Sequence, residues 1–297
     1  MTWDPLFLIA AAARWLGYLA AFVIVGATAM RRLVLPRTGF IDPTPVPLAR
    51  WAQLGTVLLA VSLVARLYFQ GRSLLEPDEP LTAEFVGLVL QSAWGRGWLA
   101  QAAAGFVAVV GWSWVRRKPS APGAARLSIV AAAAIIATAP LTGHAVGLAG
   151  APWYSPLLDL VHFGAGAAWI GTLASLTIVL RTGQPQPLAL VEAFSPLALV
   201  AGITAMAAGA VLAYGYLGGI GPLFETGYGR MVLAKLAAIG VTSGLGVYNW
   251  RSVLPRLRAG APAPIVRTAT LEALVGVVVL AITAVLVSLP APGEPAE

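Results

Sequence analysis

Long apolar runs constrain this chain more than any other feature of its sequence. The runs at 16–30 with its flanks, 127–141 and 273–289 approach or reach the roughly 20 residues that cross a 30 Å hydrocarbon layer. Only 10% of the residues are charged, against about 25% in ordinary soluble domains. A backbone that faces lipid must satisfy its hydrogen bonds within its own segment, so these runs favour helices. The sequence therefore predicts an all-α polytopic membrane protein embedded in the lipid bilayer.

The apolar pattern divides the chain into eight expected spans. We place these transmembrane helices near residues 6–30, 48–69, 94–115, 126–143, 156–180, 194–216, 229–250 and 268–289. The apolar segment 81–91 is too short to cross, and we interpret it as an interfacial helix. The first span lacks a basic leader and a clear cleavage site, so we expect it to be retained. We interpret 1–297 as a single transmembrane domain with a short acidic tail at 291–297.

The basic residues alternate from linker to linker. Thirteen of the 19 Lys and Arg residues flank or occupy the odd-numbered linkers, namely Arg31, Arg32, Arg37, Arg50, Arg116, Arg117, Lys118, Arg126, Arg181, Arg251, Arg256, Arg258 and Arg267. The positive-inside rule places those linkers in the cytoplasm and both termini outside. The net charge of +7 then reflects membrane orientation, and no basic patch of the nucleic-acid-binding kind accompanies it. We expect no nucleic-acid partner.

A short internal repeat supports an even number of helices. The segment 92–101 (SAWGRGWLAQ) aligns with 226–235 (TGYGRMVLAK), and each precedes or opens an inward-running helix. A repeat of four plus four helices keeps both halves parallel, as a duplication about an axis along the membrane normal does. Arg96 and Arg230 occupy the same place in the two segments, so we interpret them as architectural.

The chain has two histidines, and both are expected in the outer leaflet. His144 ends the fourth helix and His162 lies about two turns into the fifth, with a short linker between them. Asp159, His162 and Trp169 share one helical face, so the carboxylate can orient the imidazole as the partners of metal-bound histidines do. We predict His144 and His162 as metal ligands, with Asp159, Trp169 and Tyr228 around them. The alternative is a hydrogen-bonding histidine at an interface whose aromatic residues form an anchoring belt.

A second interpretation uses basic residues within the membrane. Five of them lie toward the outer ends of helices: Arg14, Arg66, Arg96, Arg230 and Lys235. The four arginines suit the propionates of a haem b whose axial ligands are His144 and His162. The same charges repel a metal cation. Arg14 and Arg66 can instead snorkel to lipid phosphates.

Three further residues predict a structural contact on the cytoplasmic side. Asn249, Arg251 and Glu272 can form a polar lock between the last two helices, with Glu272 in an ion pair. No Walker loop, nucleotide fingerprint or zinc-protease motif occurs, which argues against ATP-driven transport by this chain alone. We expect no enzymatic activity unless the haem interpretation holds.

Several motifs together resemble one family. They are Leu141-Thr-Gly-His144-Ala145, Asp159-Leu-Val-His162, Ala168-Trp169-Ile-Gly171, Thr226-Gly-Tyr228-Gly-Arg230 with Lys235, Tyr248-Asn249-Trp-Arg251 with Pro255, and Glu272. With these motifs the sequence resembles the CopD copper-resistance family of bacterial inner-membrane proteins. Residues 126–290 form the CopD-like core, and 1–125 resemble the family loosely.

The resemblance implies copper transport across the bacterial inner membrane through a histidine site on the periplasmic side. It also implies a periplasmic CopC-like copper-binding partner. Two alternatives stay open from the residues alone: a haem b redox protein, and an accessory subunit of a larger membrane complex.

Overall fold

The computed structural model describes residues 5–39, 45–142, 153–183 and 186–289, and these residues form helices without a strand. The long helices are α1 (Pro5–Ala29), α2 (Val46–Arg72), α4 (Ala93–Arg117), α5 (Pro122–Thr138), α6 (Ser155–Gly166), α7 (Thr172–Leu180), α8 (Pro187–Leu217), α10 (Gly227–Tyr248) and α12 (Ile265–Leu286). The shorter ones are α3 (Ala83–Gln91), α9 (Gly221–Glu225) and α11 (Leu254–Arg258). Three short segments are π-helical, namely η1 (Met30–Val34), η5 (Ala167–Gly171) and η6 (Asn249–Val253). Two others are 3₁₀-helical, namely η2 (Leu35–Thr38) and η3 (Ala139–Thr142).

Eight helices in the described ranges are long and apolar enough to cross a membrane. The prediction of an all-α polytopic membrane protein is therefore confirmed. The sixth span begins at Pro187 rather than near residue 194 and continues through Pro196. The first and seventh spans continue to Thr38 and Arg258, beyond the expected ends near residues 30 and 250. Pro187 suits the first turn because that turn has no partner for its N–H groups. Within a membrane, an interior proline is tolerated because neighbouring groups satisfy the freed carbonyl.

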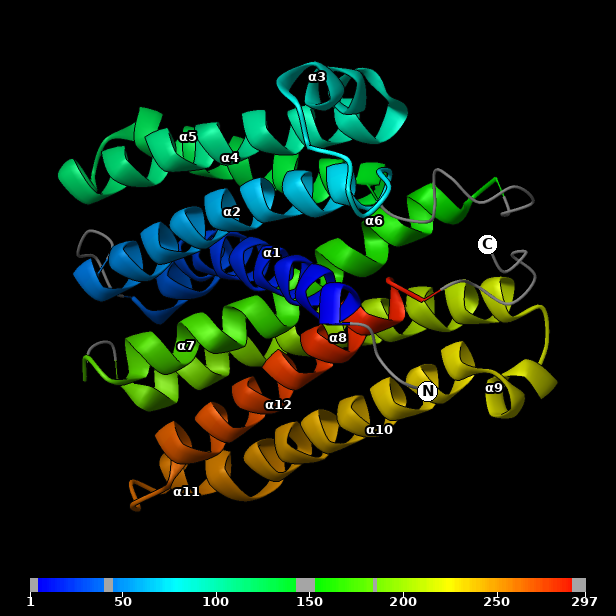
Figure 1. The fold of residues 1–297 in the computed structure, drawn as a ribbon. Coiled ribbons are helices and arrows are strands. Elements are labelled where there is room, and N and C mark those ends of the chain that lie inside the picture. The colour runs from blue at the N-terminus through cyan, green and yellow to red at the C-terminus, as the bar shows by residue number, and fades with distance from the viewer. Residues whose placement is uncertain (1–4, 40–44, 143–152, 184–185, 290–297) are drawn as a thin grey trace.

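The helices form one bundle in which α1 is central (Figure 1). It packs against α2 on one side and against α7, η5 and α12 on the other. The pairs α1–α2 and α4–α5 of the first half have counterparts in α6–α8 and α10–α12 of the second half. One contact differs. In the described residues α2 packs against α4, whereas α8 and α10 make at most marginal contact.

The sequence repeat is also a local structural repeat. Ser92 Oγ accepts a hydrogen bond from the N–H of Gly95 at 3.0 Å, and Thr226 Oγ1 accepts one from Gly229 at 2.9 Å. These hydroxyls cap the starts of α4 and α10. A Cβ at either glycine would overlap a carbonyl oxygen of the short helix before it, α3 or α9. The apolar segment expected at 81–91 is therefore a helix, α3, and it has a shorter equivalent in the second half.

The two halves meet where α1 crosses η5. Gly26 of α1 and Gly171 of η5 are in backbone contact, because a Cβ at either glycine would overlap the main chain of the other helix. Small residues drive such close packing in membranes, where lipid is as apolar as a leucine side chain. The crossing therefore depends on both glycines.

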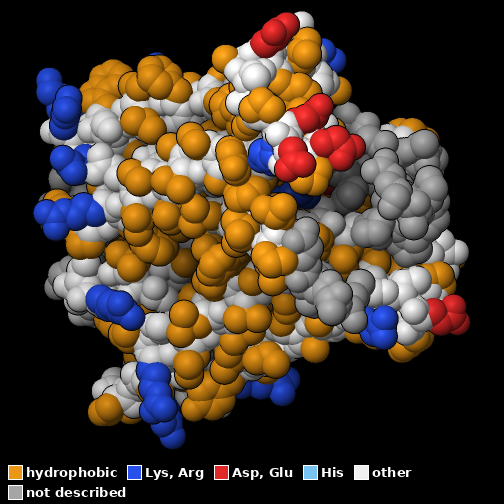
Figure 2. Space-filling model, viewed as in Figure 1, with side chains coloured by type: hydrophobic (Ala, Val, Ile, Leu, Met, Phe, Trp, Pro, Cys, Tyr) orange, Lys and Arg blue, Asp and Glu red, His pale blue; other side chains and the backbone are white. Residues whose placement is uncertain are grey.

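Charge is segregated to the two ends of the bundle. Figure 2 shows hydrophobic side chains across the middle of the visible face, with basic side chains at one end and most acidic ones at the other. The start of α1 and the end of α12 lie at the same end of the bundle (Figure 1). Eight crossings require that arrangement.

Candidate functional site

His162 lies on α6 and faces α8. Its Nδ1 is 2.7 Å from the carbonyl oxygen of Ala205. A carbonyl oxygen only accepts, so Nδ1 carries the proton and Nε2 keeps its lone pair. A Cβ at Gly209 would lie 2.7 Å from Cε1 and 2.9 Å from Nδ1 of the imidazole, so the ring rests on that glycine. The backbone of α8 thus holds His162 in the tautomer that presents Nε2 to a ligand.

The other predicted ligand, His144, lies outside the described residues. Among the residues that are described, no three His, Cys, Asp or Glu side chains gather in a group that could hold a metal ion. Of the two predicted ligands, His162 lies within the described residues.

Asp159 lies one turn before His162 on α6, and charged and phenolic side chains from three other helices surround it. Its carboxylate interacts electrostatically with Tyr18 of α1, Tyr216 of α8 and Lys235 of α10. Lys235 also lies within electrostatic range of His162. The described hydrogen bond of the imidazole goes to the α8 backbone. The carboxylate of Asp159 and the ammonium group of Lys235 attract each other. We call His162, Asp159 and Lys235 the histidine cluster.

The two aromatic residues predicted around the histidines have different positions. Trp169 is buried in η5, and its indole ring packs against Gly202 of α8. It therefore fastens the fifth span to α8. Tyr228 is half-buried in the first turn of α10.

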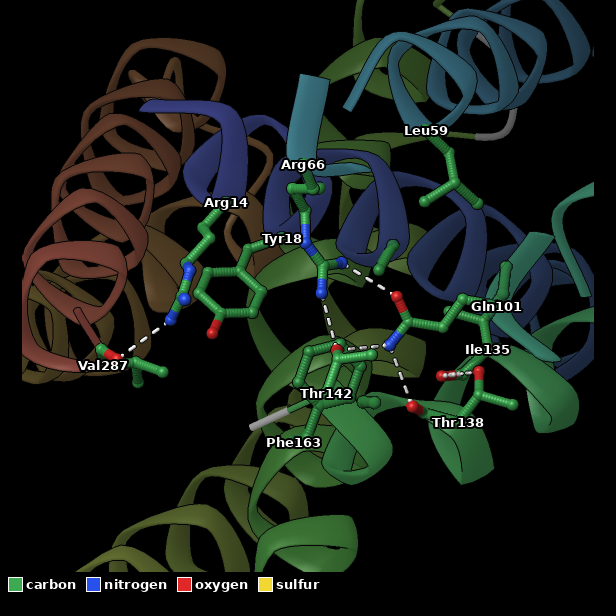
Figure 3. A pocket seen from close by; sticks show the side chains of 13 residues that line it. Arg14, Tyr18, Leu59, Arg66, Gln101, Ile135, Thr138, Thr142, Phe163 and Val287 are labelled. Atoms are coloured by element: carbon green, nitrogen blue, oxygen red, sulfur yellow. Dashed lines mark hydrogen bonds between the residues drawn. The ribbon is translucent and has the colours of Figure 1, made fainter. Parts of the chain in front are cut away.

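A second polar group lies between α1, α2, α4 and η3. Arg66 donates from Nη1 to Gln101 Oε1 at 2.8 Å and from Nη2 to Thr142 Oγ1 at 2.6 Å. Gln101 Nε2 donates to the carbonyl of Thr138 and to Thr142 Oγ1, both at 2.9 Å. Nearby, Arg14 Nη1 donates to the carbonyl of Val287 at 2.9 Å. Figure 3 shows the two guanidinium groups on either side of Tyr18. We call Arg14, Arg66, Gln101 and Thr142, taken together, the arginine cluster.

Two cavities converge on this cluster. The inner one has a volume of about 50 Å³ and is bordered by Tyr18, Gln101, Thr142 and the two arginines (Figure 3). The outer one has a volume of about 530 Å³, and side chains of α1, α2 and the start of α4 are part of its lining. Arg14 and Arg66 line both cavities. They therefore stand at the junction between an outer vestibule and a small inner chamber.

The structure separates the four arginines that the haem interpretation groups together. Arg14 and Arg66 lie close together, whereas Arg96 and Arg230 are exposed at the separate junctions that begin α4 and α10. Arg96 Nη1 donates to a carbonyl at the end of α3 at 2.8 Å. His162 borders neither cavity. The four arginines therefore do not converge on one place, and the two that line the cavities do so apart from His162.

The polar lock at the opposite end of the bundle forms with two of its three predicted members. Asn249 Nδ2 donates to Glu272 Oε2 at 2.9 Å, and Glu272 is only 5% exposed. The side chain of Arg251 is exposed and lies over the ring of Trp250, 5.7 Å from its centroid. The described partner of Glu272 is therefore an amide, where the sequence favoured a basic residue.

Sequence reasoning missed Gln101, Thr142 and Gly209. Gln101 could have been found, because it closes the first repeat segment at the place where Lys235 closes the second. Thr142 sits in a motif that was singled out only for its histidine. Nothing in the sequence marks Gly209 among the 32 glycines of the chain, since its role depends on the ring that packs onto it.

Comparison with known proteins identifies the family. The family model described as "Copper resistance protein D-like, N-terminal domain" matches residues 3–154, and the model "Copper resistance protein D" matches residues 188–286. The copper transport protein CutJ of Bacillus subtilis (strain 168) is 32% identical over 145 residues. That match covers 47% of this chain and 26% of the relative, so the chain spans about a quarter of that relative's length. No solved structure matches the chain. Because the N-terminal family model alone covers half of the sequence, this protein belongs to the copper resistance protein D (CopD) family.

Proposed function

We propose that this protein moves copper ions across the bacterial inner membrane, with His162 and His144 as copper ligands near the outer face. The family match and the similarity to a protein named for copper transport support a copper substrate. The observation that carries the proposal is the imidazole of His162, whose Nδ1 is held by Ala205. Its Nε2 is free to bind a metal, and imidazole is a good ligand for copper.

Basic residues within the membrane would repel a copper cation, but the histidine cluster lies apart from the two arginines that line the cavities. His162 and Phe163 are neighbours on α6, but Phe163 borders the arginine cavity whereas the ring of His162 packs onto α8. The ring of Phe163 also lies 6.2 Å from that of Tyr18. The arginines and His162 therefore lie on different sides of α6, with Phe163 facing the arginine cavity and His162 facing α8. Beside His162, the opposite charges of Asp159 and Lys235 offset each other, so a copper ion meets less repulsion there than near the arginines.

The proposed path runs between α6, α8 and α10. These helices carry the members of the histidine cluster, and in the described part of the chain α8 and α10 scarcely touch. The charge pattern supports an orientation with the basic end in the cytoplasm and both termini outside. In that orientation His162 lies in the periplasmic half of the bundle. A separate periplasmic CopC-like protein would then deliver copper to this side.

Replacing the histidines tests the proposal. In cells that depend on this protein for copper accumulation, His162→Ala and His144→Ala should each lower accumulated copper towards the level without the protein. Phe163→Leu is the matched control, because it changes the neighbouring side chain without removing a ligand. Equal amounts of membrane-inserted protein must be verified for all variants. Wild-type accumulation in both histidine variants would contradict the site.

The same purified protein separates copper from haem. We expect the wild type to bind copper, with binding lost in His162→Ala, and to show no Soret absorption. A stoichiometric haem spectrum that disappears in either histidine variant would replace the transport proposal with electron transfer.

A further inference from the structure

We propose that Arg14 and Arg66 form a binding site for an oxyanion, a phosphate or carboxylate group, which enters from the outer cavity. This site is separate from the histidine cluster, and the proposal does not depend on copper being the transported ion. It rests on the hydrogen bonds, charges and cavities of the arginine cluster.

Hydrogen-bond accounting shows an excess of donors at the inner cavity. Three acceptors around it are already used: Gln101 Oε1 accepts from Arg66, the carbonyl of Thr138 accepts from Gln101, and the carbonyl of Val287 accepts from Arg14. A guanidinium group has five N–H donors. The described bonds use two of those donors on Arg66 and one on Arg14.

Two hydroxyls add to the same excess. Thr142 Oγ1 accepts from both Arg66 and Gln101, which leaves its own O–H to donate elsewhere. Tyr18 lies between the two arginines and borders the inner cavity (Figure 3). A ligand that only accepts hydrogen bonds complements this set. An ionised phosphate or carboxylate is such a ligand, and it matches the planar fork of arginine.

The charges lead to the same conclusion. Arg14 and Arg66 are within electrostatic range of each other and are both half-buried. In the described residues their hydrogen-bond partners are neutral. The carboxylate of Asp159 acts on Tyr18 beside them, but one carboxylate offsets at most one of the two charges. Two like charges in a poorly solvated setting repel each other. A bound anion would offset both.

The cavities provide both space and access. The inner chamber of about 50 Å³ has room for a few water molecules or one small anionic group. The outer cavity of about 530 Å³ adjoins it, because Arg14 and Arg66 line both. Arg72 lies on the wall of the outer cavity, but its guanidinium already donates to backbone carbonyls of the loop at 76–79. The unused donors are therefore those of Arg14 and Arg66.

The oxyanion has two possible sources, which share this chemistry. One is a free anion from the outer solution, and the other is the phosphate of a lipid headgroup whose chains lie along the apolar wall formed by Leu6, Phe7 and Phe69. Both would place a phosphate oxygen at the same two guanidinium groups.

Equilibrium dialysis of the full-length protein tests the site. The protein is purified in an uncharged detergent without copper and dialysed against radiolabelled inorganic phosphate at low ionic strength. We expect the wild type to bind close to one phosphate. Loss of a charged hydrogen-bond donor should weaken binding about tenfold or more in Arg14→Gln and in Arg66→Gln. Arg96→Gln is the control, because Arg96 is exposed and lies outside both cavities.

A second arm distinguishes the two sources. Short-chain phosphatidylglycerol is added in place of phosphate, and the melting temperature (Tm) of each variant is measured. A lipid headgroup site predicts that the lipid raises the Tm of the wild type and of Arg96→Gln but not that of Arg14→Gln. It also predicts that free phosphate does not bind. Arg14→Gln decides the result even if Arg66→Gln does not fold, because Arg14 makes a single described hydrogen bond. Absence of both phosphate binding and a lipid-dependent Tm shift in the wild type overturns the proposal, as does equal binding by Arg14→Gln.

Discussion

Gln101 and Lys235 close the two segments of the internal repeat, on α4 and α10, yet their surroundings differ. Gln101 sits in a closed network in which its amide joins Arg66 to η3 through bonds of 2.8 to 2.9 Å. Lys235 faces Asp159 and lies near His162, between helices that scarcely contact each other. Equivalent positions therefore hold a structural amide in one half and a cation beside the proposed copper ligand in the other.

The difference between the surroundings of Gln101 and Lys235 indicates that the two halves of the bundle have different roles. In the first half, the polar residues join α2, α4 and η3 into a firm unit, and α2 packs directly on α4. In the second half, the corresponding pair α8 and α10 is separated, and the polar residues have few described hydrogen bonds to one another. The polar residues of the first half therefore join its helices, whereas those of the second half include the ligand that we propose for copper.

Placing lysine, the residue of the second half, at position 101 of the first half should have the largest effect, and this effect is on stability. Gln101→Lys places a cation against Arg66 and removes the acceptor of its 2.8 Å bond. The repulsion of two charges at 4 Å is about 4 kcal/mol at an effective dielectric constant of 20. We expect a large loss of folded protein, measured as Tm and as the monodisperse fraction in detergent. Gln101→Glu serves as the control, since a carboxylate keeps an acceptor for Arg66. Normal stability of Gln101→Lys would show that the network is not structural.

Displacing the imidazole of His162 without removing it should have the next largest effect, and we expect this effect on copper affinity. Gly209→Ala introduces a Cβ 2.7 Å from Cε1 of His162, so the ring has to leave the carbonyl of Ala205. Losing the group that orients a metal-bound histidine typically lowers affinity about 10–100-fold.

The matched control for this change is Gly240→Ala, because no atom lies within 4 Å of a Cβ at that position. Copper binding by the purified protein is the measurement for both variants. We expect Gly240→Ala to bind like the wild type. Equal affinity for Gly209→Ala would show that the backbone of α8 does not orient the ligand.

Unbalancing the charges of the histidine cluster should have the smallest effect, with opposite signs. Lys235→Gln removes the positive charge that faces Asp159 and keeps its negative charge, and we expect copper affinity to rise. Asp159→Asn leaves Lys235 uncompensated, and affinity should fall. A partly solvated charge contributes about 1 kcal/mol, which is about fivefold in each direction. Changes of the same sign in both variants would show that neither residue acts through its charge.

The sequence predicts the fold well because each span carries its own signal. Length and hydropathy locate eight helices, and Ser92 and Thr226 mark the starts of two of them. The sixth span was expected from near residue 194, whereas α8 begins at Pro187. The helix extends back to that proline because the first turn does not need the N–H group that proline lacks.

The site is predicted less completely because its geometry depends on contacts between helices. The spacing of Asp159 and His162 correctly places both on α6, but it cannot indicate that the carbonyl of Ala205 binds the imidazole. Likewise, composition shows basic residues toward the outer ends, but only the packing of α1 and α2 joins Arg14 to Arg66 and separates Arg96 from them. The role of His144 stays a prediction.

The glycine crossing of α1 and η5 also limits how this bundle can change shape. Gly26 and Gly171 meet through their backbones, so no side chain at that point can repack to absorb a displacement. Translation of one helix along the other would drive main-chain atoms into each other. A movement that opens the second half towards one side of the membrane must therefore turn about this crossing, which gives the bundle a fulcrum at the junction of its two repeats.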